Sequence, residues 1–345
     1  MRLTSDFGAV VRVVCLSLSA ALLWQPLASA AGEPAASAGV AASAPLVPWM
    51  ARIGQAAASL SYEGTLMFSH GGVVSSARVL HVCTGNQRLE RIEMLDGRAR
   101  LQYRHNDQML TLWPGARLAV VEPREPVAEF PALPGAAGLD PLLNYKLVPV
   151  GSGRIAGHPA ELMLMQPKDG LRFARRLWAH PATGLLLRSD VLGPQGEVLE
   201  STAFSDLRID ARLQAEPLLA AMKRLDGYRM VRPQPLKVEL EDEGWRMTQP
   251  VPGFQLVSCS KRMLQAQAAD GEPLQVLQSV FSDGLSHVSV FIEAYDAQRH
   301  KQAMRTALGA THTVTFRQGD WWLTIVGEVP SATVQRFETL LERKR

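Results

Sequence analysis

The sequence predicts an α+β, β-rich fold, in which a large antiparallel sheet is followed by a smaller α+β domain. Three observations support this prediction. One segment with helical spacing opens the fold at 46–60. Many short segments then alternate apolar and polar residues with a period of two, separated by tight-turn pairs such as Gly71-Gly72 and Asp96-Gly97. The alternation stops over 211–235 and resumes beyond it, which indicates a linker between two domains.

The bulk composition is that of a globular protein. The chain has 345 residues, of which 47% are hydrophobic and 20% are charged, and this length suits two domains. Its 36 basic and 33 acidic residues give a formal net charge of +3. Because this balance offers no strong field to steer a polyanion, nucleic-acid binding is disfavoured as the main function.

Residues 1–30 have the organisation of a cleavable signal peptide. Arg2 and Arg12 flank a short leader, and the apolar stretch 13–24 is too short to span a bilayer. The leader ends in Ala-Ser-Ala, the small-residue pattern that signal peptidase recognises. We therefore expect a mature chain that begins near Ala31 and is exported to a bacterial periplasm, with an uncleaved amphipathic anchor as the alternative.

The first domain is expected over 46–210, after a flexible tether of small residues at 31–45. An amphipathic helix is predicted from the helical spacing of Leu46, Trp49, Ile53, Ala56 and Leu60. The alternating segments predict about eleven strands, enough for a strongly curved sheet that wraps this helix. They lie at 62–70, 73–83, 88–95, 101–105, 109–113, 118–122, 145–150, 160–167, 173–179, 185–192 and 198–207.

A proline-rich stretch interrupts this series of strands. The segment 123–134, PREPVAEFPALP, has four prolines and cannot join a hydrogen-bonded ladder, so it predicts a loop. A short helix is expected at 139–141. The smaller domain is expected over 236–345, with a last helix at 332–342 and strands at 254–259, 274–281, 288–294, 311–317 and 321–326.

The stretch VFSDGLSHVSVFIE at 280–293 contains the residue types of a hydrolase triad. Asp283 and Gly284 lie between two apolar runs, which is a strong signal for a hairpin. Four residues of strand cover about 13 Å, so Asp283 cannot orient His287 as the acid of a triad does. We interpret the segment as a hairpin rather than a catalytic site.

No other motif predicts an active site, so we expect the protein not to be an enzyme. The eight histidines are scattered singly, and neither His-x-x-x-His nor Cys-x-x-Cys occurs, so no metal or cofactor is predicted. After removal of the leader, two cysteines remain, Cys83 and Cys259. Export would permit a disulfide bond between them, but two buried free thiols are the expected state.

A curved sheet with large apolar side chains on one face can enclose a ligand cavity instead of a solid core. An ordinary sealed core is the alternative, because apolar stripes most often serve that purpose. The candidates for lining a lipid cavity are Leu66, Phe68, Val79, Leu101, Tyr103, Leu110, Leu112, Trp178, Leu187 and Phe204.

Several short segments, in order along nearly the whole mature chain, resemble those of the RseB/MucB family of periplasmic regulators of the envelope-stress sigma factor. In the first domain they are LSYEGT at 60–65, ER at 90–91, LDG at 95–97, GHPA at 157–160, PKD at 167–169, RLW at 176–178, TGL at 183–185, SD at 189–190 and FSDL at 204–207. In the second domain they are VPGF at 251–254, SDGL at 282–285, VSVFI at 288–292 and VGEVP at 326–330.

The resemblance implies a first domain like the LolA/LolB lipoprotein carriers, an unclosed β-barrel with covering helices. It also implies a negative regulator of a sigma-E (AlgU-type) pathway that binds the periplasmic domain of an RseA/MucA-type anti-sigma factor. Binding would shield that segment from site-one proteolysis. Lipopolysaccharide or the acyl chains of a mislocalised lipoprotein would be the ligand that triggers release.

For partner binding we expect an exposed edge of the second-domain sheet, to which an extended peptide could add a strand. The candidate contacts are Ser282, Asp283, Gly284, Leu285, His287, Ser289 and Phe291; the alternative is that they only stabilise the hairpin. The competing function is a periplasmic lipid or lipoprotein carrier without a regulatory partner. Assembly into a homo-oligomer is left open by the sequence.

Overall fold

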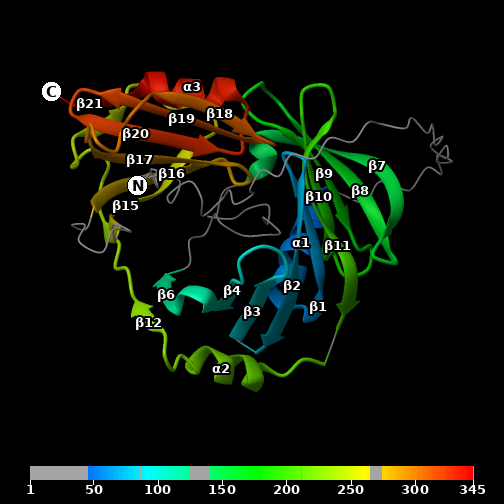
Figure 1. The fold of residues 1–345 in the computed structure, drawn as a ribbon. Coiled ribbons are helices and arrows are strands. Elements are labelled where there is room, and N and C mark those ends of the chain that lie inside the picture. The colour runs from blue at the N-terminus through cyan, green and yellow to red at the C-terminus, as the bar shows by residue number, and fades with distance from the viewer. Residues whose placement is uncertain (1–45, 86, 124–139, 211, 265–273, 345) are drawn as a thin grey trace, which may run out of the picture.

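The computed structural model describes residues 46–85, 87–123, 140–210, 212–264 and 274–344. Within these ranges the chain forms a large curved sheet, followed by a smaller sheet that carries a helix on one face (Figure 1). A long connection along one side of the molecule joins the two, and the expected two-part, β-rich α+β fold is confirmed. Among the described residues, no helix is long and apolar enough to cross a membrane.

The larger sheet has twelve strands among the described residues, in the spatial order β12-β6-β5-β4-β3-β2-β1-β11-β10-β9-β8-β7. Neighbouring strands are antiparallel except β12, which pairs with β6 in parallel. The strands are β1 (Tyr62–His70), β2 (Val73–Thr84), β3 (Gln87–Met94), β4 (Leu101–His105), β5 (Gln108–Trp113), β6 (Leu118–Pro123), β7 (Tyr145–Ile155), β8 (His158–Pro167), β9 (Ala174–Ala179), β10 (Leu186–Leu192), β11 (Val198–Ile209) and β12 (Arg229–Val231).

The larger sheet is curved but does not close, because β12 and β7 are its two ends. The expected unclosed barrel is therefore confirmed. Among the described residues, two short 3-10 helices, η1 (Pro114–Ala116) and η3 (Pro141–Leu143), lie between strands. The second corresponds to the short helix expected at 139–141. Most of the proline-rich stretch 123–134 lies outside the described residues.

Helix α1 (Leu46–Ser59) covers one face of this sheet. Trp49 and Ile53 pack with residues of β7 to β10. One turn further along, Ala56 packs with residues of β1, β2, β10 and β11. Because these positions recur every three or four residues, one apolar stripe contacts both halves of the curved sheet. The expected helix, wrapped by the sheet, is confirmed.

The segment expected to be a linker with one helical turn contributes to the first domain. Helix α2 (Ala215–Lys223) packs through Ala215 and Leu218 on Val82 and Leu89, on the face opposite to α1. Strand β12 then extends the larger sheet beside β6. The sequence does not predict β12, because a strand of three residues is too short to show alternation.

The smaller sheet has seven strands among the described residues, in the order β13-β15-β16-β17-β20-β19-β18. Helix α3 (Ser331–Leu340) buries Val334 and Phe337 in the core of this domain. A separate pair joins β14 (Trp245–Met247) to β21 (Leu341–Arg343). The seven strands are β13 (Leu236–Lys237), β15 (Gln255–Leu264), β16 (Leu274–Ser282), β17 (His287–Ala294), β18 (Met304–Leu308), β19 (Thr311–Gln318) and β20 (Trp321–Gly327).

Candidate functional site at the domain junction

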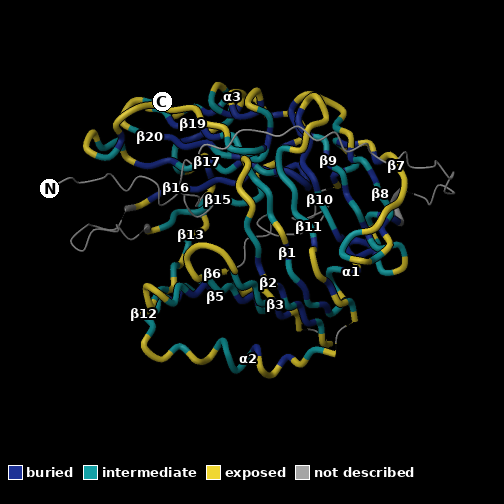
Figure 2. The backbone as a smooth tube through the Cα atoms, turned by 45° about the vertical axis from the view of Figure 1, so that its right-hand side comes forward, coloured by how far each residue is buried: buried dark blue, intermediate teal, exposed yellow. Residues whose placement is uncertain are grey.

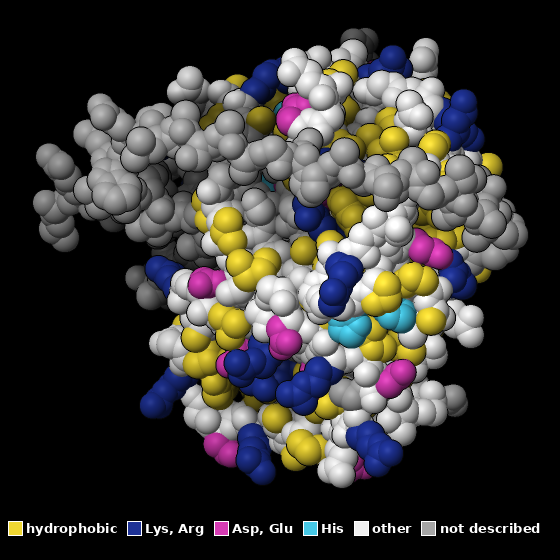
Figure 3. Space-filling view, turned by 90° about the vertical axis from the view of Figure 1, so that its right-hand side faces the viewer, with side chains coloured by type: hydrophobic (Ala, Val, Ile, Leu, Met, Phe, Trp, Pro, Cys, Tyr) yellow, Lys and Arg dark blue, Asp and Glu magenta, His cyan; other side chains and the backbone are white. Residues whose placement is uncertain are grey.

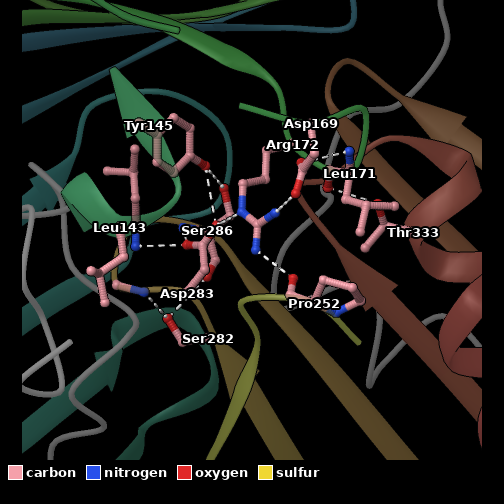
Figure 4. Close-up of polar contacts among 12 residues, drawn as sticks. Leu143, Tyr145, Asp169, Leu171, Arg172, Pro252, Ser282, Asp283, Ser286 and Thr333 are labelled. Atoms are coloured by element: carbon pink, nitrogen blue, oxygen red, sulfur yellow. Dashed lines mark hydrogen bonds and ion pairs between the residues drawn. The ribbon is translucent and has the colours of Figure 1, made fainter. Parts of the chain in front are cut away.

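The side chain of Arg172 lies at the centre of the contact between the two domains (Figure 4). It follows β8, and all three of its nitrogens donate hydrogen bonds. Nε donates to Oδ2 of Asp283 over 2.5 Å, and Nη1 to Oδ2 of Asp169 over 2.5 Å. Nη2 donates to the carbonyl oxygen of Pro252 over 2.7 Å. One arginine therefore connects a loop of the first domain with two loops of the second.

Asp283 is the matching acceptor in the β16–β17 turn. Its Oδ1 accepts the backbone N–H groups of Leu285 and Ser286, at 2.9 and 2.7 Å. Its Oδ2 accepts from Arg172 and from the hydroxyl of Tyr145, the latter at 3.2 Å. The side chains of Arg172 and Asp283 both have 0% exposure. A buried carboxylate is stable only when such donors are present. The first domain supplies donors to the Asp283 carboxylate, and the second domain supplies this carboxylate to the Arg172 guanidinium.

Tyr145, at the start of β7, is buried against this turn. Its hydroxyl also lies 3.3 Å from Oγ of Ser286. Burial, and next the nearby charge of Asp283, raise the pKa of Tyr145. The phenol is therefore neutral and serves as a hydrogen-bond donor to the carboxylate.

A second group of charges lies in the same junction. Arg175 on β9 donates through Nη2 to Oε1 of Glu328, over 2.5 Å. Glu200 on β11 accepts the backbone N–H of Ala310 over 2.8 Å and lies 2.7 Å from Nδ1 of His70. The hydrogen bond with Glu200 raises the pKa of His70, against the opposing effect of burial. Burial raises the pKa of Glu328.

Close backbone packing completes the junction. Gly253 has a φ of +76°, and a Cβ atom there would overlap Arg172 and Asn144. The hydroxyl of Thr333, in the first turn of α3, donates to the carbonyl oxygen of Leu171 over 2.7 Å. We call the contacts of Arg172, Asp283, Tyr145, Arg175–Glu328 and His70–Glu200 the domain junction.

The triad-like hairpin belongs to this junction. Ser282 pairs with His287 in the β16–β17 register, as a hairpin requires. Oγ of Ser282 donates to the carbonyl oxygen of Ser286, and Asp283 is bound to Arg172 instead of to His287. Burial lowers the pKa of His287, and the charge of Arg175 lowers it further. The interpretation as a structural hairpin agrees with this geometry.

The expectation that this hairpin forms an exposed sheet edge is wrong. Strand β17 pairs with β16 on one side and with β20 on the other, and the described edges are β13 and β18. Strand addition at β17 is therefore blocked. Partner contact by the seven candidates stays a prediction, but it cannot occur by strand addition at β17. Among the candidates, Ser282, Asp283, Gly284 and Leu285 are buried, and His287, Ser289 and Phe291 are half-buried.

The ten cavity candidates do not share one face. Val79 pairs with Ile92, whereas Tyr103 pairs with the adjacent Arg91, and adjacent strand residues point to opposite faces. One group packs in the cluster that contains Ala56 of α1: Leu66, Phe68, Val79, Trp178, Leu187 and Phe204. The other packs near α2 and β12: Leu101, Tyr103, Leu110 and Leu112. The expectation that the ten side chains share one apolar face is therefore wrong. A lipid cavity stays a prediction.

The cysteines and histidines form no further site. Cys83 and Cys259 are free thiols, as expected; Cys259 is buried as expected, whereas Cys83 is only half-buried. Oγ of Ser279 lies 3.3 Å from Sγ of Cys259. Within the described ranges, no group of three or more His, Cys, Asp or Glu side chains could hold a metal ion.

Sequence reasoning missed Arg172, Tyr145, Arg175, Glu200 and Glu328, because they come from distant parts of the chain and none belongs to a chemical motif. A signal existed nonetheless. Three of the segments that carry the family resemblance, at 167–169, 251–254 and 282–285, supply the partners of Arg172: Asp169, Pro252 and Asp283.

The fold and junction define a class: a two-domain β-sheet protein whose domains are joined through a buried polar contact. Residues 46–222 match the MucB/RseB N-terminal domain, and residues 239–342 match the MucB/RseB C-terminal domain. The chain belongs to the MucB/RseB family, and the resemblance seen in the sequence is confirmed.

Several relatives and solved structures span both domains. The chain is 28% identical over 301 residues to the "Sigma factor AlgU regulatory protein MucB" of Pseudomonas aeruginosa, covering 84% of this chain and 88% of that protein. It is 26% identical over 320 residues to the "Sigma-E factor regulatory protein RseB" of Escherichia coli, covering 91% and 96%. A solved structure, "The complex structure of Pseudomonas aeruginosa MucA/MucB", superposes with a TM-score of 0.65 at 26% identity, over 86% of this chain and 98% of that chain.

Proposed function

We propose that this protein is a periplasmic regulator that binds the periplasmic segment of a transmembrane anti-sigma factor of the RseA/MucA type. It shields that segment from site-one proteolysis and releases it when it senses lipopolysaccharide or mislocalised lipoprotein. Membership of the MucB/RseB family supports this proposal, as do relatives named for sigma-factor regulation. A similar protein has also been solved as "Crystal structure of MucB in complex with MucA(peri)".

The domain junction is the observation that carries the proposal. A sensor needs two arrangements that its ligands bind with different affinity. The fully buried pair of Arg172 and Asp283 defines one such arrangement, since separating the domains would break the ion pair between them. A ligand that prefers separated domains then weakens partner binding by its differential binding energy, typically about 1–3 kcal/mol.

The lipid-sensing step is the finer part of the proposal. The larger sheet carries apolar clusters on both faces, one with α1 and one with α2. Acyl chains would compete with α1 or α2 for these surfaces, because apolar surface removed from water is stabilising whichever group covers it. The ligand therefore acts on the first domain, and the junction transmits its effect to the second.

The other assignments follow from the same proposal. The leader at 1–30 directs export to the periplasm, where the protein would meet the periplasmic segment of the anti-sigma factor. The role is binding, without catalysis: the polar groups of the 282–289 hairpin hold the two domains together through Arg172 and Tyr145.

A calorimetric titration tests this function. The mature chain, from Ala31, is titrated with the periplasmic segment of its anti-sigma factor, with and without lipopolysaccharide. We expect binding that lipopolysaccharide weakens, and protection of the segment from site-one protease in the complex. Absence of binding in both conditions, together with acyl chains that co-purify with the protein, would identify a lipid carrier and reject the regulator.

A further inference from the structure

Four exposed basic residues surround the C-terminal end of helix α2. They are Arg117, Lys223, Arg224 and Arg232, and we call them the basic corner. They come from three places in the chain: the turn before β6, the end of α2, and the residue after β12. Figure 2 shows α2 and the start of β12 at the far end of the first domain, away from the smaller sheet.

Packing brings these three places together. Met222, Leu225, Tyr228 and Met230 join the cluster around Tyr103, which holds the end of α2 against β4 to β6 and β12. The backbone N–H of Arg229 also donates to the carbonyl oxygen of Arg117, over 2.7 Å. The fold therefore fixes the backbone positions from which the four basic side chains extend.

The strand register places Arg232 on the side of the sheet that α2 covers. Met230 pairs with Ala119, and both residues belong to the cluster beneath α2. Because side chains two positions apart point the same way along an extended chain, Arg232 follows Met230 on that side. Arg117 has a φ of +45° in the turn before β6, where its carbonyl oxygen accepts from the first residue of β12.

The charge of this region is unusual for the molecule. Residues 223–237 contain five basic side chains and one acidic side chain, a net charge of +4, whereas the whole chain totals +3. On the face shown in Figure 3, basic and acidic side chains are interspersed. Some exposed arginines elsewhere form ion pairs, as Arg305 does with Glu338 and Arg246 with Glu342. Within the described parts of the chain, the four residues of the basic corner form none.

The helix end explains only part of this pattern. Cations at the C-terminus of a helix interact favourably with its dipole, which accounts for Lys223 and Arg224. Arg117 and Arg232 lie outside the helix and gain nothing from that effect. Cations that form no ion pair with the described residues, beside half-buried Tyr228, match a surface that meets anionic headgroups, where basic and amphipathic side chains are favoured.

We propose that the basic corner docks this protein on an anionic phospholipid surface. Helix α2 and the start of β12 lie far from the smaller sheet, so docking there leaves both domains free to act (Figure 2). Attraction comes from Lys and Arg near the charged surface, each contributing roughly fivefold in affinity at low ionic strength. The inference goes beyond the proposed regulatory function and stands independently of partner binding.

Vesicle flotation tests this proposal with the full mature chain. We expect the protein to bind vesicles of phosphatidylcholine mixed with phosphatidylglycerol, and to bind pure phosphatidylcholine at least about tenfold more weakly. Added salt should weaken binding, because screening shortens the range of exposed charges. The variant R117Q/K223Q/R224Q/R232Q should lose at least about tenfold in affinity.

The control variant R78Q/R98Q/K146Q/R336Q removes four exposed cations scattered over other surfaces. Its affinity should stay within about threefold of the wild type, because it lowers the net charge equally but leaves the corner intact. Circular dichroism establishes that both variants fold. Equal losses in the two variants, or binding to an acidic peptide without binding to vesicles, would overturn the proposal. Failure of the anti-sigma titration would not affect this result.

Discussion

Nε of Arg172 lies 2.5 Å from Oδ2 of Asp283, although 111 residues separate them in the chain and each belongs to a different domain. The hydroxyl of Tyr145 reaches the same carboxylate oxygen at 3.2 Å. Since both charged side chains are fully buried, neither can be solvated while the domains stay together. The two domains therefore behave as one unit until this contact opens.

Removal of the Asp283 side chain should strongly destabilise the folded protein. We expect Asp283→Ala to lower the free energy of unfolding by about 3–5 kcal/mol, because it removes the carboxylate that accepts from Nε of the buried Arg172. The double variant R172M/D283A should lower the free energy of unfolding by less than the sum of the two single changes, because it removes both fully buried charges. Denaturant titrations of the single and double variants measure this coupling.

The exposed pair of Arg305 and Glu338 supplies the matched control. Glu338→Ala should change stability by at most about 1 kcal/mol, because solvent screens that pair. Comparable losses in Asp283→Ala and Glu338→Ala would contradict the assignment of Arg172 and Asp283 as the centre of the junction.

The junction should respond to pH through His70. The hydrogen bond with Glu200 raises the pKa of this histidine above its unfolded value. Protonated His70 therefore contributes stability fully below about pH 6.5, and this contribution is lost as the pH rises through the folded-state pKa. Glu328 acts in the same direction, because burial raises its pKa. His287 acts in the opposite direction, because burial lowers its pKa.

Thermal unfolding across a pH series checks this prediction. His70→Gln should be less stable than the wild type at mildly acidic pH, and the difference should shrink as the pH rises. His287→Gln should show the reverse trend. NMR titration of the His70 ring should give a lower pKa in Glu200→Gln than in the wild type. A His70→Gln difference that stays constant with pH would mean that His70 has only a packing role.

Gly253 should be intolerant of a side chain. With a φ of +76° and no room beside Arg172 and Asn144, Gly253→Ala adds a steric clash to the backbone strain. Gly319→Ala is the control, since its φ is +62° but nothing lies within 4 Å of its Cβ position. The control should lose about 1–2 kcal/mol from strain alone, and Gly253→Ala should lose clearly more. Equal losses, measured by denaturant unfolding, would show that the junction can relax around the added methyl group.

The cluster beneath α1 should be a major source of stability. Leu187 is fully buried there, so Leu187→Ala should cost about 2–5 kcal/mol through lost transfer energy and the cavity left behind. Leu143 is 69% exposed, and Leu143→Ala should change stability by less than about 0.5 kcal/mol. Thermal unfolding compares the two, and a loss below 1 kcal/mol for Leu187→Ala would indicate a loosely packed cluster.

Much of the fold could be predicted because alternation is a local signal. Residues 101–105 were expected as a strand and form β4 with the same bounds. Strand β18 was missed because four of its five residues are exposed and show no alternation. The distribution of the cavity candidates over two faces was also missed. It depends on which residues of β3 pair with β2 and β4, and single-segment patterns do not contain this information.

The junction was largely beyond prediction for a related reason. Arg172 has little meaning in its own segment, because its partners Asp283 and Pro252 lie 111 and 80 residues away. The hairpin around Asp283 was predicted correctly from its turn chemistry. Its burial was not, because the polar residues that suggest a solvated turn are satisfied by the other domain.

The central claim is that the arrangement of the two domains controls partner binding. Calorimetric titration of the anti-sigma periplasmic segment into the wild type and into Asp283→Asn tests it most directly. We predict that Asp283→Asn, folded by circular dichroism, shifts the affinity by about 5–150-fold, the range of an allosteric coupling. In this variant, lipopolysaccharide should weaken binding of the anti-sigma segment less than it does in the wild type. Unchanged affinity and an unchanged lipopolysaccharide effect in a folded Asp283→Asn variant would contradict the claim.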